Sequence, residues 1–413
     1  MMARTMADNL RPRDAKEVEQ AVQWALGNGK TFEVVGHGSK RAIGRAAQWD
    51  ATLDLSALSG VTLYEPEELV LSAKAGTPIA EIEALVASRN QQLAFEPMDY
   101  AVLLGGPAGA GTIGGTIAAN LSGPRRIKAG AARDHFLGFS AVSGRGETFK
   151  SGGRVVKNVT GYDLCKLLAG SWGTLAAMTD VTIKTLPKAE TEATVLVLNL
   201  RDAIANKVMA AAMASFADVS GAAHLSAAVA ARIAETASVE AAATVFRLEG
   251  VAPSVAQRKT VLESLLAPFG TLATLGEAAS RALWRAIRDV TPFAANGAAG
   301  KHDVWRISTE PTRGAVVGEA LSAATDTELL YDWAGGLVWA AMPPSDNANA
   351  PLVHSTVAAN GGHATLIRAP VAVRAAVDVF MPEAPVLAAL TKRVRGGFDP
   401  HGVLNAGRMW AGV

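Results

Sequence analysis

The spacing of apolar residues near the N-terminus predicts one helix followed by several strands. Apolar side chains recur every three or four positions from Asp14 to Leu26, and Gly27 and Gly29 follow them. This period predicts an amphipathic helix that stops at the glycines. Short apolar or alternating runs then predict strands at 32–35, 52–55, 61–64 and 69–75. A second helix is expected from Thr77, as its cap, through Pro78 in its first position, to about residue 88.

The rest of the chain continues to alternate between strand-like and helix-like segments. Strands are predicted at 135–142, 147–150 and 174–186, with a short helix at 162–169. From residue 190, the expected strands are 193–200, 243–248, 304–308, 336–341 and 364–368, and the expected alanine-rich helices are 203–217, 254–266, 313–323 and 371–379. Strands separated by single helices predict an α+β fold in which helices cover a sheet.

Composition narrows the class of protein. The chain has 413 residues, 49% of them hydrophobic, which is enough for two or three domains. Its net charge of +1 gives no reason to expect a nucleic acid or an anionic membrane surface as the main partner. The single cysteine, Cys165, excludes an internal disulfide and an iron-sulfur cluster held by this chain alone. The first residues do not resemble a secretory signal, and no apolar run is long enough for a transmembrane helix, so we expect a cytoplasmic protein.

Glycine is concentrated in the middle of the N-terminal half. Residues 101–180 contain 16 of the 40 glycines, and six of them fall between Gly105 and Gly115. Glycine-dense backbone is costly to order, which indicates sharp turns or a close approach to a ligand. An earlier glycine turn, Gly36-His37-Gly38-Ser39-Lys40-Arg41, follows a predicted strand and could form an anion nest with Lys40 or Arg41. An ordinary β-turn with solvated cations is the alternative, and neither a P-loop nor a Rossmann spacing is present.

Three further segments complete a recognisable set. Thr112-Ile113-Gly114-Gly115-Thr116-Ile117-Ala118-Ala119-Asn120 mixes small and periodic apolar residues, as in a short helix against a flat ligand. The third segment is Lys157-Asn158-Val159-Thr160-Gly161-Tyr162-Asp163-Leu164, followed by Gly170-Ser171-Trp172-Gly173-Thr174-Leu175. The last is Phe398-Asp399-Pro400-His401-Gly402-Val403-Leu404-Asn405-Ala406-Gly407-Arg408. In this order the segments resemble the flavin-binding proteins of the vanillyl-alcohol oxidase type, also called PCMH-type FAD proteins.

The resemblance implies a fold and a cofactor site. It implies an FAD-binding domain of two α/β subdomains at 1–187, an α+β cap-like domain at 188–395, and a segment at 396–413 that returns to the flavin. It implies non-covalent FAD on the following residues: Val35, Gly36, His37, Gly38, Ser39, Lys40, Gly106, Gly109, Gly111, Thr112, Gly114, Gly115, Ala118, Ala119, Asn120, Gly123, Gly161, Gly173, Thr174, Leu175, Met178 and Asn405.

Within that family, the form of the first loop and of the chain end resembles the small FAD-binding subunits of bacterial glycolate dehydrogenases. This likeness implies a role in oxidising glycolate or a similar 2-hydroxy acid. It also implies a larger FAD-binding catalytic subunit and an iron-sulfur subunit as partners, electrons leaving toward quinone, and peripheral association with the inner face of the cell membrane through the complex. A stand-alone flavin oxidoreductase for another alcohol or acid, and a non-catalytic assembly subunit, are the alternatives.

The chain departs from the family in ways that bear on catalysis. Larger members carry a paired-histidine metal motif, and no histidines here are three or four positions apart, so we expect no metal site. Trp172 and Ala176 replace an acid and a glycine of the family pattern. His37 stands between glycines rather than after a pair of them, which favours non-covalent FAD, and Cys165 among leucines indicates a buried structural thiol.

Candidate catalytic residues are those able to hold a carboxylate or move a proton in the later half of the chain. They are Lys301, His302, Arg306, Tyr331, Arg368 and His401. Ordinary core or surface roles explain each of them equally well. The tryptophans, including Trp305, Trp333, Trp339 and Trp410, are expected in the core or at an interface rather than in a ligand cage.

Overall fold

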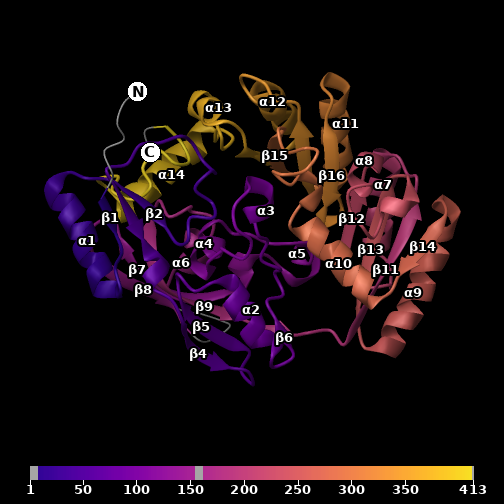
Figure 1. Cartoon of the computed structure of the whole chain (residues 1–413), viewed down its shortest axis with the longest axis horizontal. Coiled ribbons are helices and arrows are strands. Elements are labelled where there is room, and N and C mark those ends of the chain that lie inside the picture. The colour runs from indigo at the N-terminus through magenta and orange to yellow at the C-terminus, as the bar shows by residue number, and fades with distance from the viewer. Residues whose placement is uncertain (1–7, 154–160, 412–413) are drawn as a thin grey trace.

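The computed structural model describes residues 8–153 and 161–411. The N-terminal half of these residues is built on two sheets (Figure 1). A parallel sheet has the order β1 (Asp8–Leu10), β3 (Ala51–Asp54), β2 (Phe32–Val35), and an antiparallel sheet has the order β4 (Val61–Glu65), β5 (Val70–Lys74), β9 (Ala176–Lys184), β7 (Phe136–Ser143), β8 (Thr148–Gly152). The helices of this half are α1 (Ala15–Asn28), α2 (Ile79–Ala87), α3 (Ala101–Leu104), α4 (Ile113–Ala118), α5 (Arg126–Ala129) and α6 (Leu164–Leu168). A short pair, β10 (Leu186–Pro187) with β6 (Gln91–Gln92), leads out of it.

The later part of the chain forms one antiparallel sheet of eight strands. Its order is β14 (Leu272–Leu275), β11 (Thr191–Leu198), β13 (Ala243–Gly250), β12 (Gly221–Leu225), β16 (Glu328–Asp332), β17 (Leu337–Met342), β15 (Asp303–Ser308), β18 (His363–Arg368). The helices around it are α7 (Asp202–Met213), α8 (Ala227–Ala230), α9 (Ala252–Leu266), α10 (Glu277–Arg288), α11 (Gly314–Ala324) and α12 (Ala350–Asn360). The chain ends with α13 (Val371–Ala376) and α14 (Pro385–Phe398), which lie over the N-terminal half (Figure 1).

The first helix forms for the reasons that its sequence predicts. The Asp14 carboxylate accepts a hydrogen bond from the Glu17 amide at 2.8 Å and so caps the N-terminus. Val18 and Val22 are fully buried on one face. Gly29 ends the helix with φ 60°, in the left-handed region that favours glycine.

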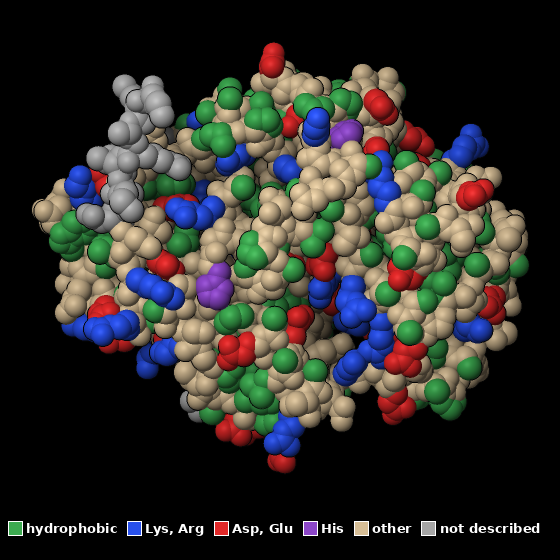
Figure 2. All heavy atoms as spheres, viewed as in Figure 1, with side chains coloured by type: hydrophobic (Ala, Val, Ile, Leu, Met, Phe, Trp, Pro, Cys, Tyr) green, Lys and Arg blue, Asp and Glu red, His purple; other side chains and the backbone are tan. Residues whose placement is uncertain are grey.

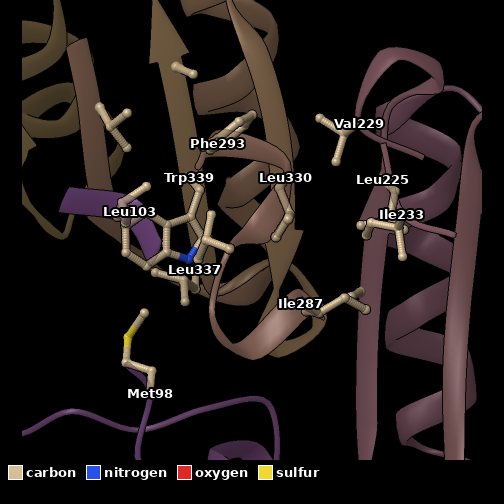
Figure 3. Packing of buried hydrophobic residues seen from close by; sticks show 14 of the residues in the cluster. Met98, Leu103, Leu225, Val229, Ile233, Ile287, Phe293, Leu330, Leu337 and Trp339 are labelled. Carbon is tan, nitrogen blue, oxygen red and sulfur yellow. The ribbon is translucent and has the colours of Figure 1, made fainter. Parts of the chain in front are cut away.

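The two faces of the eight-stranded sheet bury different partners. Trp305 and Ile307 on β15 pack with residues of α11 and α12 on the outer face. Trp339 and Leu337 on β17 belong instead to the core that includes Met98 and Leu103 of the N-terminal half, and Figure 3 shows these side chains together. Because strand neighbours alternate between faces, the inner face of this sheet is directed at the N-terminal half.

A buried ion pair also joins the two halves. The Arg247 guanidinium on β13 is 1% exposed and donates to the two Glu96 carboxylate oxygens at 2.8 and 2.9 Å. Lys and Arg side chains gather beside α10 along this seam (Figure 2), where Arg281, Arg285 and Arg288 line a cavity between the halves. The seam therefore combines an apolar core with a buried ion pair and a cationic edge.

The α+β expectation is confirmed, and several elements correct the sequence prediction. Thr77 does not cap α2; its hydroxyl donates to the Lys74 carbonyl at 2.6 Å, and no side chain caps the helix. The strand expected at 174–186 breaks into β9 and β10, and the helix expected at 371–379 ends at Ala376. The pattern missed the strands β1, β6, β12, β14 and β16 and the helices α3, α5, α8, α10, α12 and α14. The boundaries at residues 187 and 395 stay predictions.

None of the helices within 8–153 and 161–411 combines the length and the apolar character needed to cross a bilayer.

Candidate functional site: a glycine-lined FAD cavity

One cavity brings together three segments that are far apart in the sequence. It lies between the glycine loop after β2, the α4 helix, and the turn before β9, and it encloses about 680 Å³ including its open mouth. The C-terminal segment closes one side. The lining residues are Val34, Val35, Gly36, His37, Gly38, Ser39, Lys40, Arg41, Leu55, Ala75, Thr112, Gly114, Gly115, Ala118, Ala119, Trp172, Gly173, Ala176, Met178, Asn405 and Arg408.

Two glycines let the lining segments approach one another closely. A Cβ on Gly36 would lie 2.6 Å from the Thr112 hydroxyl oxygen, and a Cβ on Gly114 would lie 2.8 Å from the Ala75 carbonyl oxygen. Both distances are shorter than van der Waals contact, so a side chain at either position would push the segments apart. Thr112 also begins α4, because its hydroxyl accepts a hydrogen bond from the Gly115 amide at 3.2 Å.

The cavity is cationic on one side. Lys40, Arg41 and Arg408 line it, and no carboxylate does so among the residues that the structure describes. Glu33, behind the loop, pairs with Arg41. Burial lowers the pKa of Lys40 to about 8, with Asp99 opposing the shift and Arg408 adding to it. Burial likewise lowers the pKa of Arg408 to about 10, with Glu33 opposing the shift.

The cations fit an anionic group. The Nε atom of Arg408 is buried without a hydrogen-bond partner within the described chain, and so is that of the neighbouring Arg374. A buried guanidinium nitrogen without an acceptor is costly, and a bound pyrophosphate would supply both acceptors and negative charge. Leu55, Trp172 and Met178 give another part of the lining an apolar surface suited to an aromatic ring. The cavity therefore fits a molecule that joins a pyrophosphate to flat rings, as FAD does.

The C-terminal segment is fixed against this cavity by two side chains. Asn405 is 1% exposed; its amide oxygen accepts from the Val34 amide at 2.9 Å, and its amide nitrogen donates to the Trp172 carbonyl at 2.8 Å. The buried Asp399 carboxylate accepts from the amides of Val403 and Leu404 and so shapes the preceding turn. Asn405 thus ties the glycine loop, the turn before β9 and the chain end together.

Fourteen of the residues predicted to bind FAD line this cavity. They are Val35, Gly36, His37, Gly38, Ser39, Lys40, Thr112, Gly114, Gly115, Ala118, Ala119, Gly173, Met178 and Asn405. The other eight predicted residues lie elsewhere: Gly106, Gly109, Gly111, Asn120, Gly123, Gly161, Thr174 and Leu175. Lys157 and Asn158 of the third motif lie outside the described residues. Direct FAD contact by any of these residues stays a prediction.

The eight residues outside the cavity have other local roles where contacts define them. The Gly109 amide donates to Asp99 at 2.7 Å, and the Gly111 carbonyl accepts from the Ile79 amide at 2.8 Å. A Cβ on Gly123 would lie 2.7 Å from the Glu96 carbonyl oxygen. Thr174 and Leu175 line a separate cavity beneath α14. These residues belong to segments around the FAD cavity and do not line it.

The sequence prediction of the site missed seven lining residues. Arg41 belongs to the glycine-loop motif and was expected only as a possible anion-binding cation, and Val34 lies in the predicted strand that leads into that motif. Arg408 ends the last motif, but the residues by themselves do not show that the chain end returns to this cavity. Trp172 and Ala176 were noted only as departures from the family pattern, and Leu55 and Ala75 carry no chemical signal. Ordinary apolar residues of this kind are recognised only when the fold brings them to a cavity.

The candidate catalytic residues are dispersed. The Tyr331 hydroxyl donates to Asp202, and burial raises the tyrosine pKa. Arg368 donates to four backbone carbonyls, including that of Leu103 at 2.9 Å, which is a structural use of its guanidinium. His401 is exposed on the turn after α14. None of these three lines the FAD cavity, and a catalytic role for them stays a prediction.

Two residues weighed as attachment points differ in environment. His37 lines the cavity and is exposed. Cys165 is a free thiol, 3% exposed, and burial raises its pKa to about 12, which keeps it protonated and unreactive. The expectation of a buried thiol at Cys165 is confirmed.

Comparisons with known proteins agree with this fold and cavity. Residues 9–152 match the FAD binding domain family model. The structure superposes on p-cresol methylhydroxylase with a TM-score of 0.72 at 13% identity, covering 97% of this chain and 88% of that one. An alkyldihydroxyacetonephosphate synthase gives a TM-score of 0.68 at 15% identity, covering 96% of this chain and 76% of that one. These similarities define the PCMH-type fold, and the family model agrees with FAD as the cofactor.

Sequence relatives define the family more closely. The glycolate oxidase subunit GlcE of Escherichia coli (strain K12) is 30% identical over 401 residues, covering 95% of this chain and 96% of that protein. The glycolate oxidase subunit GlcD of Bacillus subtilis (strain 168) is 33% identical over 136 residues, 33% of this chain and 28% of that protein. The chain belongs to the family of FAD-binding oxidoreductases that includes GlcE.

Proposed function

We propose that this chain is the FAD-binding subunit of a complex that oxidises glycolate, or a closely similar 2-hydroxy acid, to the 2-oxo acid. The observation that carries the proposal is the match to the Escherichia coli glycolate oxidase subunit GlcE, which extends over nearly the whole length of both chains. The cationic, glycine-lined cavity supports it, because its lining suits the cofactor that such an oxidation requires.

The reaction removes two electrons and two protons from the substrate. The carbon–hydrogen bond next to the carboxylate breaks, and the hydroxyl proton passes to a base. FAD supplies an acceptor for the hydride. Residues of this chain would hold the cofactor: the glycine loop and Lys40 toward the pyrophosphate, and Trp172 and Met178 along the ring system.

Two further parts of the proposal concern partners. We propose a larger FAD-binding subunit and an iron-sulfur subunit that carries electrons toward quinone, with any membrane association made through that complex. The single cysteine supports a separate iron-sulfur protein, because cluster ligation needs several thiolates. We also propose that FAD is bound non-covalently.

Expression of the chain alone and together with its proposed partners tests these points. We expect a yellow protein with the visible flavin spectrum in both preparations, with FAD released by acid precipitation. We expect glycolate-dependent dye reduction to be strong only in the complex.

The opposite outcomes would overturn different parts. Full glycolate turnover by the isolated chain would favour the stand-alone enzyme. Failure to hold FAD even after reconstitution would favour the assembly subunit. Flavin that stays attached to the acid-precipitated protein would refute non-covalent binding.

A further inference from the structure

Two arginines contact one buried tryptophan beside the FAD cavity. Trp333, just after β16, is 4% exposed, and its indole nitrogen donates to the Gly123 carbonyl at 3.0 Å, which fixes the ring. The guanidinium carbon of Arg126 lies 4.2 Å from the ring centre, and that of Arg306 lies 5.1 Å from it. The tryptophan therefore holds two cations in one place.

These cations form no ion pair in the part of the chain that the structure describes, although two carboxylates act on them from farther away: Asp134 opposes the lowering of the Arg126 pKa by burial, and the charge of Arg306 opposes the raising of the Asp332 pKa by burial. Neither Arg126 nor Arg306 forms an ion pair with a described carboxylate, and the Arg306 Nε atom is buried without a hydrogen-bond partner there. Nearby Arg125 behaves differently, because its guanidinium pairs with Glu249 at 2.6 Å. Burial lowers the pKa of Arg126 to about 10, and Arg306 is the next cause. The two positive charges repel each other where they stand.

The His363 side chain lies on the same face of the eight-stranded sheet as the Arg306 side chain. In the β15–β18 pairing, Arg306 is opposite Thr365 and Ser308 is opposite His363, so these four side chains share one face. Trp339 lies opposite Arg306 on β17 and belongs to the core shared with the N-terminal half. The Arg306 and His363 side chains consequently project from the face directed at the FAD-binding half.

The histidine is a neutral hydrogen-bonding group. Desolvation is the largest cause that lowers the pKa of His363 to about 4, and the charges of Arg306 and Arg126 lower it further. The residue as a whole still has an exposed surface. At neutral pH it can donate one hydrogen bond and accept another. An anion placed among the three side chains would be attracted by the two guanidinium cations and could accept a hydrogen bond from the His363 ring.

The cluster adjoins the FAD cavity through two routes. Ala119 and Trp172 line the cavity and pack against the core cluster that includes Trp333. On the other side, the lining residue Trp172 lies 5.5 Å from Phe380 between ring centres, and Phe380 bridges Thr365, which pairs with Arg306. A molecule held by the arginines would therefore lie near the cofactor site.

We propose that Arg126, Arg306 and His363 form a binding site for the carboxylate of a small organic acid at the sheet side of the FAD cavity. This inference rests on the proposed function for the nature of the acid, a 2-hydroxy acid. The planar guanidinium groups match the two oxygens of a carboxylate, and one negative charge placed between the two cations offsets their mutual repulsion. The chain would thus carry acid-recognition residues of its own and not only a cofactor site.

The test compares R126Q and R306Q with R285Q, an exposed arginine on α10 that serves as the control. Glycolate is titrated into the FAD-loaded protein, and so is oxalate, an analogue that has no hydroxyl-bearing carbon to oxidise. Binding is followed by calorimetry and by the change in flavin absorbance. We expect each cluster variant to weaken binding at least tenfold and R285Q to leave it unchanged. R306K, which keeps the charge but loses the fork of donors, should fall between them.

The unfolding temperature without ligand separates recognition from a structural role. Because the arginines repel each other, R126Q and R306Q should unfold at the same temperature as the wild type or higher, and should lose the stabilisation given by oxalate. Unchanged acid binding in both variants would overturn the proposal. So would inorganic phosphate binding as tightly as oxalate, or unligated destabilisation with unchanged affinity.

The same measurements distinguish failure of the inference from failure of the proposed function. A chain that holds FAD but does not bind glycolate or oxalate would overturn the inference and leave the flavoprotein assignment intact. A chain that takes up no FAD would overturn the proposed function, and calorimetry with oxalate on the FAD-free protein would still decide whether the three side chains bind a carboxylate.

Discussion

Replacing Asn405 with alanine should weaken both the fold around the FAD cavity and the affinity for FAD. Asn405 is almost completely buried and bonds to the Val34 amide and the Trp172 carbonyl, 371 and 233 positions away. It is also in the left-handed region, with φ 46°. No other side chain in the described chain end makes hydrogen bonds to both of these segments; Arg408 donates to the Lys40 carbonyl but meets Trp172 only through its ring face.

The magnitude follows from these contacts. Alanine leaves a buried donor and a buried acceptor unpaired, at about 1 to 2 kcal/mol each. The left-handed backbone adds about 1 kcal/mol, because asparagine tolerates this region better than alanine. We therefore expect N405A to lower the free energy of unfolding by about 3 to 5 kcal/mol.

Urea unfolding followed by tryptophan fluorescence measures this loss, and titration with FAD measures the affinity. N405G keeps the backbone freedom and loses only the hydrogen bonds, so it should recover about 1 kcal/mol relative to N405A. N28A is the matched control, because Asn28 makes one exposed hydrogen bond, to the Trp24 carbonyl. A loss below about 1 kcal/mol in N405A, together with unchanged FAD affinity, would refute the reasoning.

Three other predictions concern the cavity and the seam. G114A should lose FAD binding and about 1 to 3 kcal/mol of stability, since its Cβ would lie 2.8 Å from the Ala75 carbonyl oxygen. G27A, in open space on α1, should leave FAD binding unchanged and raise stability by up to about 1 kcal/mol, when both variants are measured by FAD titration and urea unfolding. The affinity for FAD should be constant below about pH 7 and should fall as the pH rises through about 8, because the pyrophosphate favours the charged form of Lys40. K40Q should bind FAD more weakly at every pH and should not show this fall. A pH profile in K40Q identical to that of the wild type would refute the role of Lys40. R247M should destabilise the protein by about 2 to 4 kcal/mol, because Glu96 loses its two hydrogen bonds from Arg247 and keeps Arg125 as its charged partner. R247M/E96Q should recover part of that loss in the same unfolding assay, and no recovery would contradict the pairing.

The elements that the sequence predicted correctly have their causes within a few neighbouring residues. The helix from Ala15 to Asn28 follows from its cap at Asp14, its buried stripe and the glycine at its end. Thr112 caps α4 in the same local manner. Thr77 shows the limit of such reasoning. Its hydroxyl donates to the Lys74 carbonyl in the preceding turn, and α2 begins without a side-chain cap.

The residues of the candidate site likewise fall into those that the sequence predicted and those that only the fold brings to the cavity. The glycine loop from Gly36 to Lys40 was predictable because backbone that must approach a ligand or another segment needs glycine, and this need is visible in the sequence. Arg408 was not, since its position depends on the chain end returning to β2. Strands β12 and β16 were missed because their burial comes from pairing with distant strands rather than from a strong pattern of their own.

The sequence by itself determined which local segments become helices, turns and glycine loops, and hence the FAD-binding family. Only the tertiary structure decided that Asn405 lies between Val34 and Trp172, and that Arg126 and Arg306 meet at Trp333. The physical reason is that capping and periodicity act over a few residues. The meeting of distant side chains instead depends on the order of strands in the sheets and on the summed packing of the cores between them.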